Sequence, residues 1–340
     1  MLRSFWTGAA KLIAGAFNAT MNGLTSSMPA AAAAADRNVD MLIGGQAVLE
    51  GVMMRSLTGY SVAVRQPNGG VAIKKDKLVS IAKKYPFLKL PVLRGSVVLI
   101  QSLILGMRAL DYSTNVAVDT ESGEKEMSRG AIAGTMIFAF VLAIGVFVLV
   151  PLGITNAIRH FFFPSMGNLI YNVIDGVLRA VIFFGYILSI SYMKEIRRLF
   201  QYHGAEHKTV YTFEANEDLT VENARTKSTL HPRCGTSFLL FVMAISILVF
   251  SLVPSTMPFV VKVAARVVLI PLIAGLAYEV IRFSARHLAN PVCRALTRPG
   301  MWLQKITTKE PDDTQLEIAI VALREALAYD VVQPEQAAVA

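Results

Sequence analysis

The sequence is poor in charge and in cysteine. Only 17% of its 340 residues are Asp, Glu, Lys or Arg, and it has two cysteines. Two cysteines cannot build the disulfide framework of a small secreted module. Because 54% of the residues are hydrophobic, the composition is that of neither a disordered nor a collagen-like chain. The mean hydropathy of +0.50 indicates instead that much of the apolar surface faces lipid.

Four apolar segments are predicted to cross a membrane. Residues 130–158 and 235–261 carry no charge at all, and each run exceeds the roughly 20 residues that span a hydrocarbon core as a helix. Residues 173–193 and 260–283 are also apolar enough, with their charges near the ends. We expect residues 95–107 to form a surface-lying or re-entrant helix, because only 13 uncharged residues separate its flanking arginines.

Basic residues predict how these spans are oriented. Residues 61–108 contain nine Lys and Arg against one Asp, and residues 282–309 contain six against no acidic residue. The positive-inside rule then places both termini, and the loop between the second and third spans, in the cytoplasm. We expect a multi-pass protein of the cytoplasmic (inner) membrane whose partners are the lipid bilayer and, at its basic face, anionic lipid.

The fold class predicted is a mainly α membrane protein with four transmembrane helices and a small mixed α+β cytoplasmic domain. Alternating strands on both sides of a Pro-Asn-Gly-Gly turn predict a β-hairpin at 60–75, and apolar residues at helical spacing predict a final amphipathic helix. We expect a mobile or amphipathic N-terminal arm at 1–38, a cytoplasmic α+β segment at 39–95, and a surface or re-entrant helix with a linker at 96–129. The first two spans then occupy 130–193, a cytoplasmic loop with a His/Cys cluster occupies 194–234, and the last two spans occupy 235–283. Residues 284–340 are expected to form a basic juxtamembrane segment followed by the final helix, which contains Leu316, Ile320, Leu323 and Leu327.

A metal-binding pattern directly follows the second predicted span. His203, Glu206 and His207 form an H-x-x-E-H motif. Histidines four apart share one face of a helix, where both can bind one ion while the glutamate lies near its bound water. In zinc peptidases with this inverted motif the glutamate is the general base. The motif therefore predicts two metal ligands and a catalytic role for Glu206.

A second pair of ligand types stands just before the third predicted span. If the second and third spans pack as neighbours, His231 and Cys234 return to the same membrane surface as His203 and His207. His and Cys are the usual zinc ligands, so the four predict a site for zinc or a similar divalent metal. If all four bind, the site is closed and structural; if His231 or Cys234 stays outside, a water position opens for Glu206. The alternative is that the histidines cap helices or bind lipid phosphate, and that Cys234 is simply buried.

Other charges in or near the spans have two interpretations. Glu279 is either a distal carboxylate ligand or the partner of a neighbouring arginine on its own helix, Arg282 or Arg286. Buried charge in lipid is costly and normally paired, so we expect Asp175 to contact Arg179 or Arg266 and to hold helices together.

A resemblance to known proteins is carried by five segments: Gly44 to Arg55, Arg94-Gly95, Tyr202 to Lys208, His231 to Thr236, and Tyr278 to Leu327. Over about residues 40–328 the chain resembles the YqhQ-like family of bacterial membrane proteins, often labelled as predicted metal-dependent enzymes. This resemblance implies a bacterial cytoplasmic-membrane protein and leaves the substrate open. Within the first segment, Gln46 and Glu50 lie one turn apart if that segment is helical. With Arg55 they would either line a site facing the histidines or serve structure alone.

These observations predict a metal-dependent hydrolase acting on a membrane-associated peptide or lipid. The alternative is a non-enzymatic membrane-biogenesis, ribosome-associated or lipid-associated factor, in which the metal is structural or absent and the basic face binds anionic lipid, ribosomal RNA or insertion machinery. The sequence has no motif for specific RNA readout, and we expect no specific DNA partner.

Overall fold

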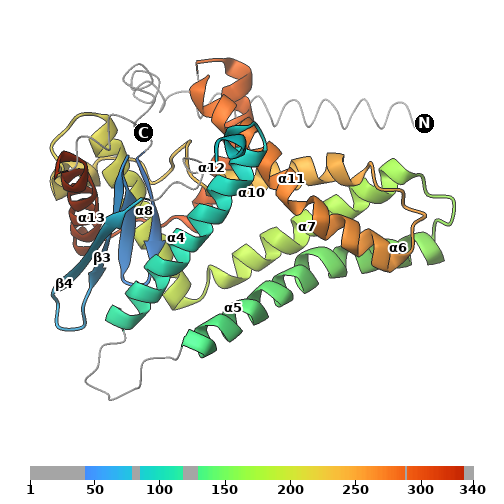
Figure 1. Ribbon diagram of the computed structural model, residues 1–340, viewed down its shortest axis with the longest axis horizontal. Helices are drawn as coiled ribbons and strands as arrows, with labels where there is room; N and C mark the ends of the chain where they lie inside the picture. Colours follow the sequence, from blue (N-terminus) through green and yellow to red (C-terminus); the bar gives the residue numbers. More distant parts are fainter. Residues whose placement is uncertain (1–42, 79–84, 118–128, 288, 333–340) are drawn as a thin grey trace, which may run out of the picture.

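The computed structural model describes residues 43–78, 85–117, 129–287 and 289–332. The predicted arm 1–38 and most of the linker before residue 129 lie outside these ranges. In chain order the elements (Figure 1) are β1 Gly44–Val48, β2 Gly51–Arg55, β3 Gly59–Arg65, β4 Val71–Lys77, η3 Pro86–Lys89, α4 Leu93–Ala117, α5 Arg129–Ile144, η4 Gly145–Leu149, α6 Val150–Phe161, α7 Asn168–Ile190, α8 Lys194–Glu214, α9 Val221–Arg225, α10 Thr236–Phe250, α11 Phe259–Arg286, α12 Pro291–Thr307 and α13 Asp313–Val332.

The four strands form one antiparallel sheet in the order β1-β2-β3-β4. The predicted hairpin is confirmed as β3 and β4, whose register pairs Arg65 with Val71. Gly69 lies at the tip with a φ of 85°, a conformation that glycine adopts without strain. The glycine-rich segment before this hairpin forms strands β1 and β2 and is therefore not helical, so Gln46 and Glu50 do not lie one helical turn apart.

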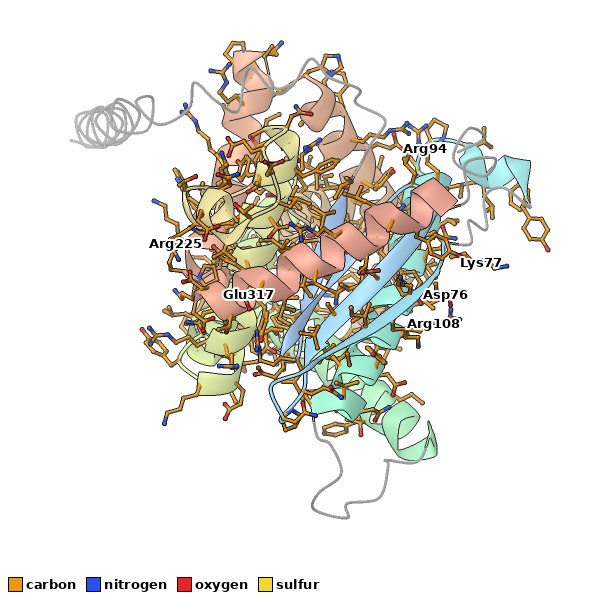
Figure 2. All side chains as sticks on the ribbon, turned by 90° about the vertical axis from the view of Figure 1, so that its left-hand side faces the viewer. Asp76, Lys77, Arg94, Arg108, Arg225 and Glu317 are labelled. Atoms are coloured by element: carbon orange, nitrogen blue, oxygen red, sulfur yellow. The ribbon has the colours of Figure 1, made fainter. Side chains whose placement is uncertain are left out.

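Helices cover both faces of the sheet. Figure 2 shows α13 crossing the strands on one face with α4 behind them. On the α13 face, Val52, Met54 and Ala63 pack against apolar residues of α8 and α13. On the other face, strand residues pack against Leu105 and Ala109 of α4. The predicted final helix is thus confirmed, and its buried residues include Leu316, Ile320 and Leu323.

Within the described residues, four helices are long and apolar enough to cross a membrane: Leu93–Ala117, Ile137–Phe161, Asn168–Ile190 and Phe259–Ser284. The second of these is the continuous helix α5-η4-α6, which contains one π-helical turn. Large apolar side chains on these helices, such as Phe138, Phe140 and Val268, are more than half exposed. A soluble protein rarely exposes so much contiguous apolar surface, so the chain is a membrane protein.

The number of long apolar helices agrees with the prediction, but their identity differs in two places. The segment predicted as a short surface or re-entrant helix lies in α4, which is 25 residues long. The uncharged run 235–261 contains α10, a helix of only 15 residues, because the chain turns after Phe250. Counting uncharged residues therefore underestimated α4, whose helix runs past Arg108, and overestimated α10, whose uncharged run includes a loop.

The predicted pairing of Asp175 is confirmed with both arginines. Arg179 Nη2 and Arg266 Nη1 donate to its two carboxylate oxygens over 2.9 and 2.6 Å. Asp175 and Arg266 are each 1% exposed. The second interaction joins α7 to α11.

Candidate metal centre

Helix α8 carries the H-x-x-E-H motif on the domain side of the bundle. It begins at Lys194, four residues after α7 ends. A Cβ at Gly204, between the two histidines, would overlap the carbonyl oxygen of Lys309. Glycine therefore lets the segment between α12 and α13 lie directly against α8, which brings Thr307 close to His203.

His203, His207 and Cys234 form one cluster. The nearest ligand atoms of the three residues lie within 4.8 Å of one another, and His203 Nε2 is 3.2 Å from Cys234 Sγ. Each histidine uses Nδ1 toward a backbone carbonyl: Thr307 O for His203 at 2.8 Å, and Thr229 O for His207. Because a carbonyl only accepts, each Nδ1 carries the proton and each Nε2 keeps its lone pair.

The neighbouring loop holds Cys234 at this position. α10 packs against α7, so the expected return of the chain to the histidines does occur. The side-chain amide of Gln304, on α12, accepts from His231 N and donates to His231 O, both over 2.8 Å. The backbone N–H and the hydroxyl of Thr236 contact Cys234 Sγ at 3.4 and 3.2 Å. These contacts fix the sulfur beside the imidazoles.

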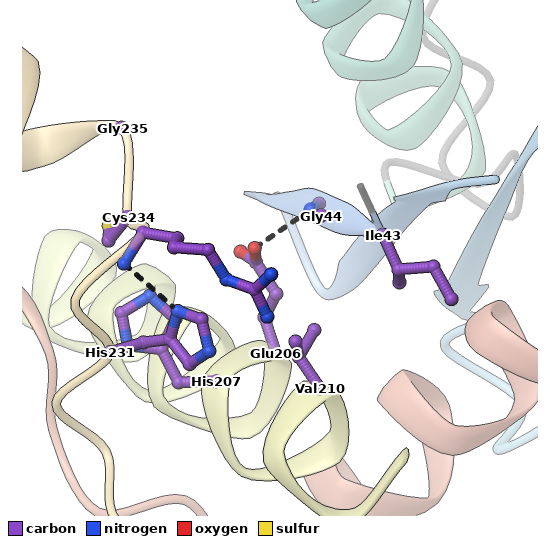
Figure 3. A pocket seen from close by; sticks show the side chains of 10 residues that line it. Ile43, Gly44, Glu206, His207, Val210, His231, Cys234 and Gly235 are labelled. Carbon is purple, nitrogen blue, oxygen red and sulfur yellow. Dashed lines mark hydrogen bonds between the residues drawn. The ribbon is translucent and has the colours of Figure 1, made fainter. Parts of the chain in front are cut away.

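Glu206 lines one open pocket of about 80 Å³ together with two members of the cluster, His207 and Cys234 (Figure 3). The backbone N–H of Gly45 donates to Glu206 Oε1 over 2.9 Å, which ties the start of the sheet to α8. Burial raises the pKa of Glu206, while the neighbouring His203 and the hydrogen bond from Gly45 N–H act against this. Burial lowers the pKa of His207, and the nearby side chain of Cys234 opposes the shift.

His231 lines the same pocket but faces a different partner. Its Nε2 lies 3.3 Å from a carboxylate oxygen of Glu214, and its Nδ1 accepts from Arg233 N over 3.3 Å. Glu214 also pairs with the guanidinium of Arg233. Although burial raises the pKa of Glu214, its contacts with His231 and Arg233 lower it overall. Sequence analysis missed Glu214; its place seven residues, or two helical turns, after His207 was the available signal.

Glu279 lies in an ion pair with α4. Arg94 Nε donates to Glu279 Oε1 over 2.6 Å, and Arg94 Nη2 binds the other oxygen. We expected Glu279 to pair with Arg282 or Arg286 of its own helix; it does pair with an arginine, but that arginine, Arg94, belongs to α4. With both oxygens occupied by Arg94, the structure does not bring Glu279 into the histidine cluster.

The three residues of the glycine-rich segment do not line the pocket. Gln46 packs against Gly106 of α4, and Arg55 ends β2. Glu50 lies in the β1-β2 turn with a φ of 53°, where it pairs with Arg198 and accepts from Tyr202 OH over 3.2 Å. The segment reaches the pocket through its first two residues instead, Gly44 and Gly45, which line it next to Ile43.

Comparison with known proteins gives two matches. Residues 90–329 match the family described as "Protein of unknown function (DUF1385)". The chain is 34% identical over 308 residues to "Uncharacterized protein YqhQ" of Bacillus subtilis (strain 168), an alignment that covers 86% of this chain and 94% of the relative. No solved structure matches the chain.

Proposed function

This chain belongs to the DUF1385 family, which agrees with the resemblance to YqhQ, and from that premise we propose that it is a membrane-bound, metal-dependent hydrolase. His203, His207 and Cys234 hold a zinc-type ion at the membrane surface, and Glu206 is the catalytic base. The substrate is a membrane-associated peptide or lipid.

The observation that carries this proposal is the state of the two imidazoles. Nδ1 of His203 and Nδ1 of His207 each donate a hydrogen bond to a backbone carbonyl group. This is the arrangement that orients histidine ligands in metal sites. His207 Nε2 is buried and has no hydrogen-bond partner in the described part of the chain. A buried lone pair without a partner is costly, and a metal ion would satisfy it. The donor set of two nitrogens and one sulfur suits zinc.

The number of ligands favours a catalytic site over a structural one. Three protein ligands leave the fourth tetrahedral position to water, as in catalytic zinc sites, and His231 is already engaged by Glu214 and Arg233. The ion would supply Lewis acidity and a water of lowered pKa. Gly45 holds Glu206 Oε1, which leaves Oε2 to take a proton from the water and to return it to the leaving group.

The basic residues give the orientation. We infer that the pocket end of the bundle faces the cytoplasm and that the membrane is the bacterial inner membrane, because the positive charge lies in the segments on that side. Glu206 and the cluster are separated from the end of span α7 only by the first half of α8. That position gives a membrane-associated substrate access to the pocket.

The test is the metal content of untagged, detergent-purified protein. We expect about one zinc per chain, lost in His207→Ala and Cys234→Ala and kept in His287→Ala, which removes an exposed histidine outside the cluster. Glu206→Gln should retain the metal but lose metal-dependent hydrolysis. Wild-type protein without stoichiometric metal, or equal loss of zinc in His287→Ala, would overturn the proposal.

One observation favours the non-enzymatic alternative. β4 is an edge strand whose lysines, Lys74, Lys75 and Lys77, are exposed, and such a row suits anionic lipid or ribosomal RNA. Lys75 is paired with Glu325, which lowers the charge available. Salt-dependent co-sedimentation with ribosomes, lost on changing Lys74 and Lys77 to Gln, would support this function; metal-dependent turnover would support the hydrolase.

A further inference from the structure

A cluster of positive charge lies inside the helix bundle, at the end opposite the metal centre. Arg159 is in the last turn of α6, Lys262 is in the first turn of α11, and Arg266 follows one turn later. Arg179 joins them from α7 through Asp175. Asp175 lies seven residues into α7, about 10 Å from its start. The cluster therefore occupies the third of the bundle next to loops 162–167 and 251–258.

The charges of this cluster do not balance. The cluster has four cationic side chains and one carboxylate, which contacts only Arg179 and Arg266, and Asp175 is the single acidic residue in segments 129–193 and 235–278. Lys262 and Arg266 are 3% and 1% exposed. Charge buried at membrane depth is costly unless it is paired, and Asp175 can neutralise only one of the four.

Neutral oxygens fill the remaining contacts. Lys262 Nζ donates to Asn156 Oδ1, Tyr171 OH and Ser255 O over 3.0 to 3.3 Å, and Arg159 donates to the same Ser255 carbonyl. These bonds satisfy donors but supply no negative charge. The ammonium of Lys262 therefore has three neutral oxygen acceptors in place of water, but no counter-ion of its own within this network.

Two donor atoms inside the cluster are left without a hydrogen-bond acceptor among the described residues. Nε of Arg179 and Nε of Arg266 are buried without a hydrogen bond in the described part of the chain. Both guanidinium groups lie about 5 Å from the ring of Phe250, so they flank the same side chain. Unpaired guanidinium donors beside excess positive charge are the features that recognise a tetrahedral oxyanion.

We propose that Arg159, Lys262, Arg266 and Arg179 form a binding site for a phosphate group. Arg159 is partly exposed beside the loop that carries Phe161, Phe162 and Phe163, three strongly exposed aromatic residues. Aromatic residues at a span end mark the interface, where lipid phosphates lie. The phosphate enters from the loop end and meets Arg159 first. It belongs either to a phospholipid headgroup or to a free phosphate.

The experiment uses delipidated full-length protein in neutral detergent. Binding and the thermal midpoint are measured with three probes: inorganic phosphate against chloride at equal ionic strength, dioctanoyl phosphatidylglycerol, and dioctanoylglycerol, which lacks the phosphate. We expect a phosphate-bearing probe to bind and to raise the midpoint, and dioctanoylglycerol to do neither. Response to phosphatidylglycerol alone assigns the site to lipid; response to inorganic phosphate assigns it to a free anion.

Two variants and one control decide whether this cluster is responsible. Arg159→Gln and Lys262→Met should each weaken binding at least about tenfold, the loss of one charge-assisted hydrogen bond. Lys194→Gln removes an exposed cation elsewhere and should leave binding unchanged. Arg159→Gln carries the test if Lys262→Met does not fold, since Arg159 is only partly buried. The proposal would be overturned if wild-type protein bound neither phosphate-bearing probe. It would also be overturned if Arg159→Gln and Lys262→Met bound the probes as tightly as wild type.

Discussion

Replacing Asp175 by Asn tests the energetics of the bundle most directly. The change removes the counter-charge of Arg266, which is 1% exposed, and of Arg179, whose side chain is 11% exposed. Breaking a buried ion pair by removing one partner costs about 3–5 kcal/mol, because the remaining charge stays buried. Asn keeps the size and one acceptor oxygen, so the loss reports on charge and not on packing. We expect the free energy of unfolding to fall by about 3–5 kcal/mol.

The assay is reversible unfolding in mixed detergent micelles, followed by circular dichroism. Glu317→Gln is the control, because Glu317 lies 3.8 Å from Arg65 with 60% of its side chain exposed; an exposed pair contributes at most about 1 kcal/mol. The double variant Asp175→Asn with Arg266→Met should lose less stability than the two single changes added together. A loss within about 0.5 kcal/mol of zero for Asp175→Asn would refute the reasoning.

Two further changes test the domain. Gly45→Ala should destabilise the protein by about 1–3 kcal/mol, because its Cβ would overlap the carbonyl oxygen of Met53; Gly44→Ala, with no atom within 4 Å of its Cβ, is the matched control in a thermal melt. Asp312→Ala should cost about 1 kcal/mol, since Asp312 Oδ1 accepts from Gln315 N while Gln315 Oε1 accepts from Asp312 N, each over 2.9 Å. Burial raises the pKa of Asp312, but its hydrogen bonds lower this pKa overall. The stabilisation that the Asp312 carboxylate provides is therefore present above the ordinary Asp pKa of about 4 and is lost as the pH falls below it. Equal acid sensitivity of Asp312→Ala and wild type would contradict the assignment.

Local sequence patterns were sufficient to predict the structure of a segment whose conformation depends mainly on its own residues. The hairpin of β3 and β4 follows from alternation around a turn that needs a glycine, and α13 follows from apolar residues at helical spacing. The expectation that Asp175 contacts Arg179 or Arg266 followed from the cost of unpaired charge in lipid; the structure shows contacts with both. Three of the four predicted ligands also come together, because α10 packs against α7 and so returns Cys234 to the histidines of α8.

Local patterns failed where a distant segment changes the outcome. Glu279 binds Arg94 of α4, and His231 binds Glu214 from the end of α8, because those partners reach them only after the helices pack. The glycine-rich segment forms strands because β3 offers it an edge to pair with, and its contribution to the pocket comes from the Gly45 backbone.

The sequence by itself determined that this chain enters a membrane, which of its segments are apolar, and which residues can bind a metal, since these follow from composition and side-chain chemistry. Only the tertiary structure decided which atoms meet. In the folded chain, Nδ1 of His203 and of His207 donates to a backbone carbonyl group, and His231 contacts Glu214. The fold also places four cationic side chains in one cluster with a single carboxylate. The physical reason is that hydrogen bonds and ion pairs act over about 3 Å, a separation that residues far apart in the chain reach only when the whole fold is formed.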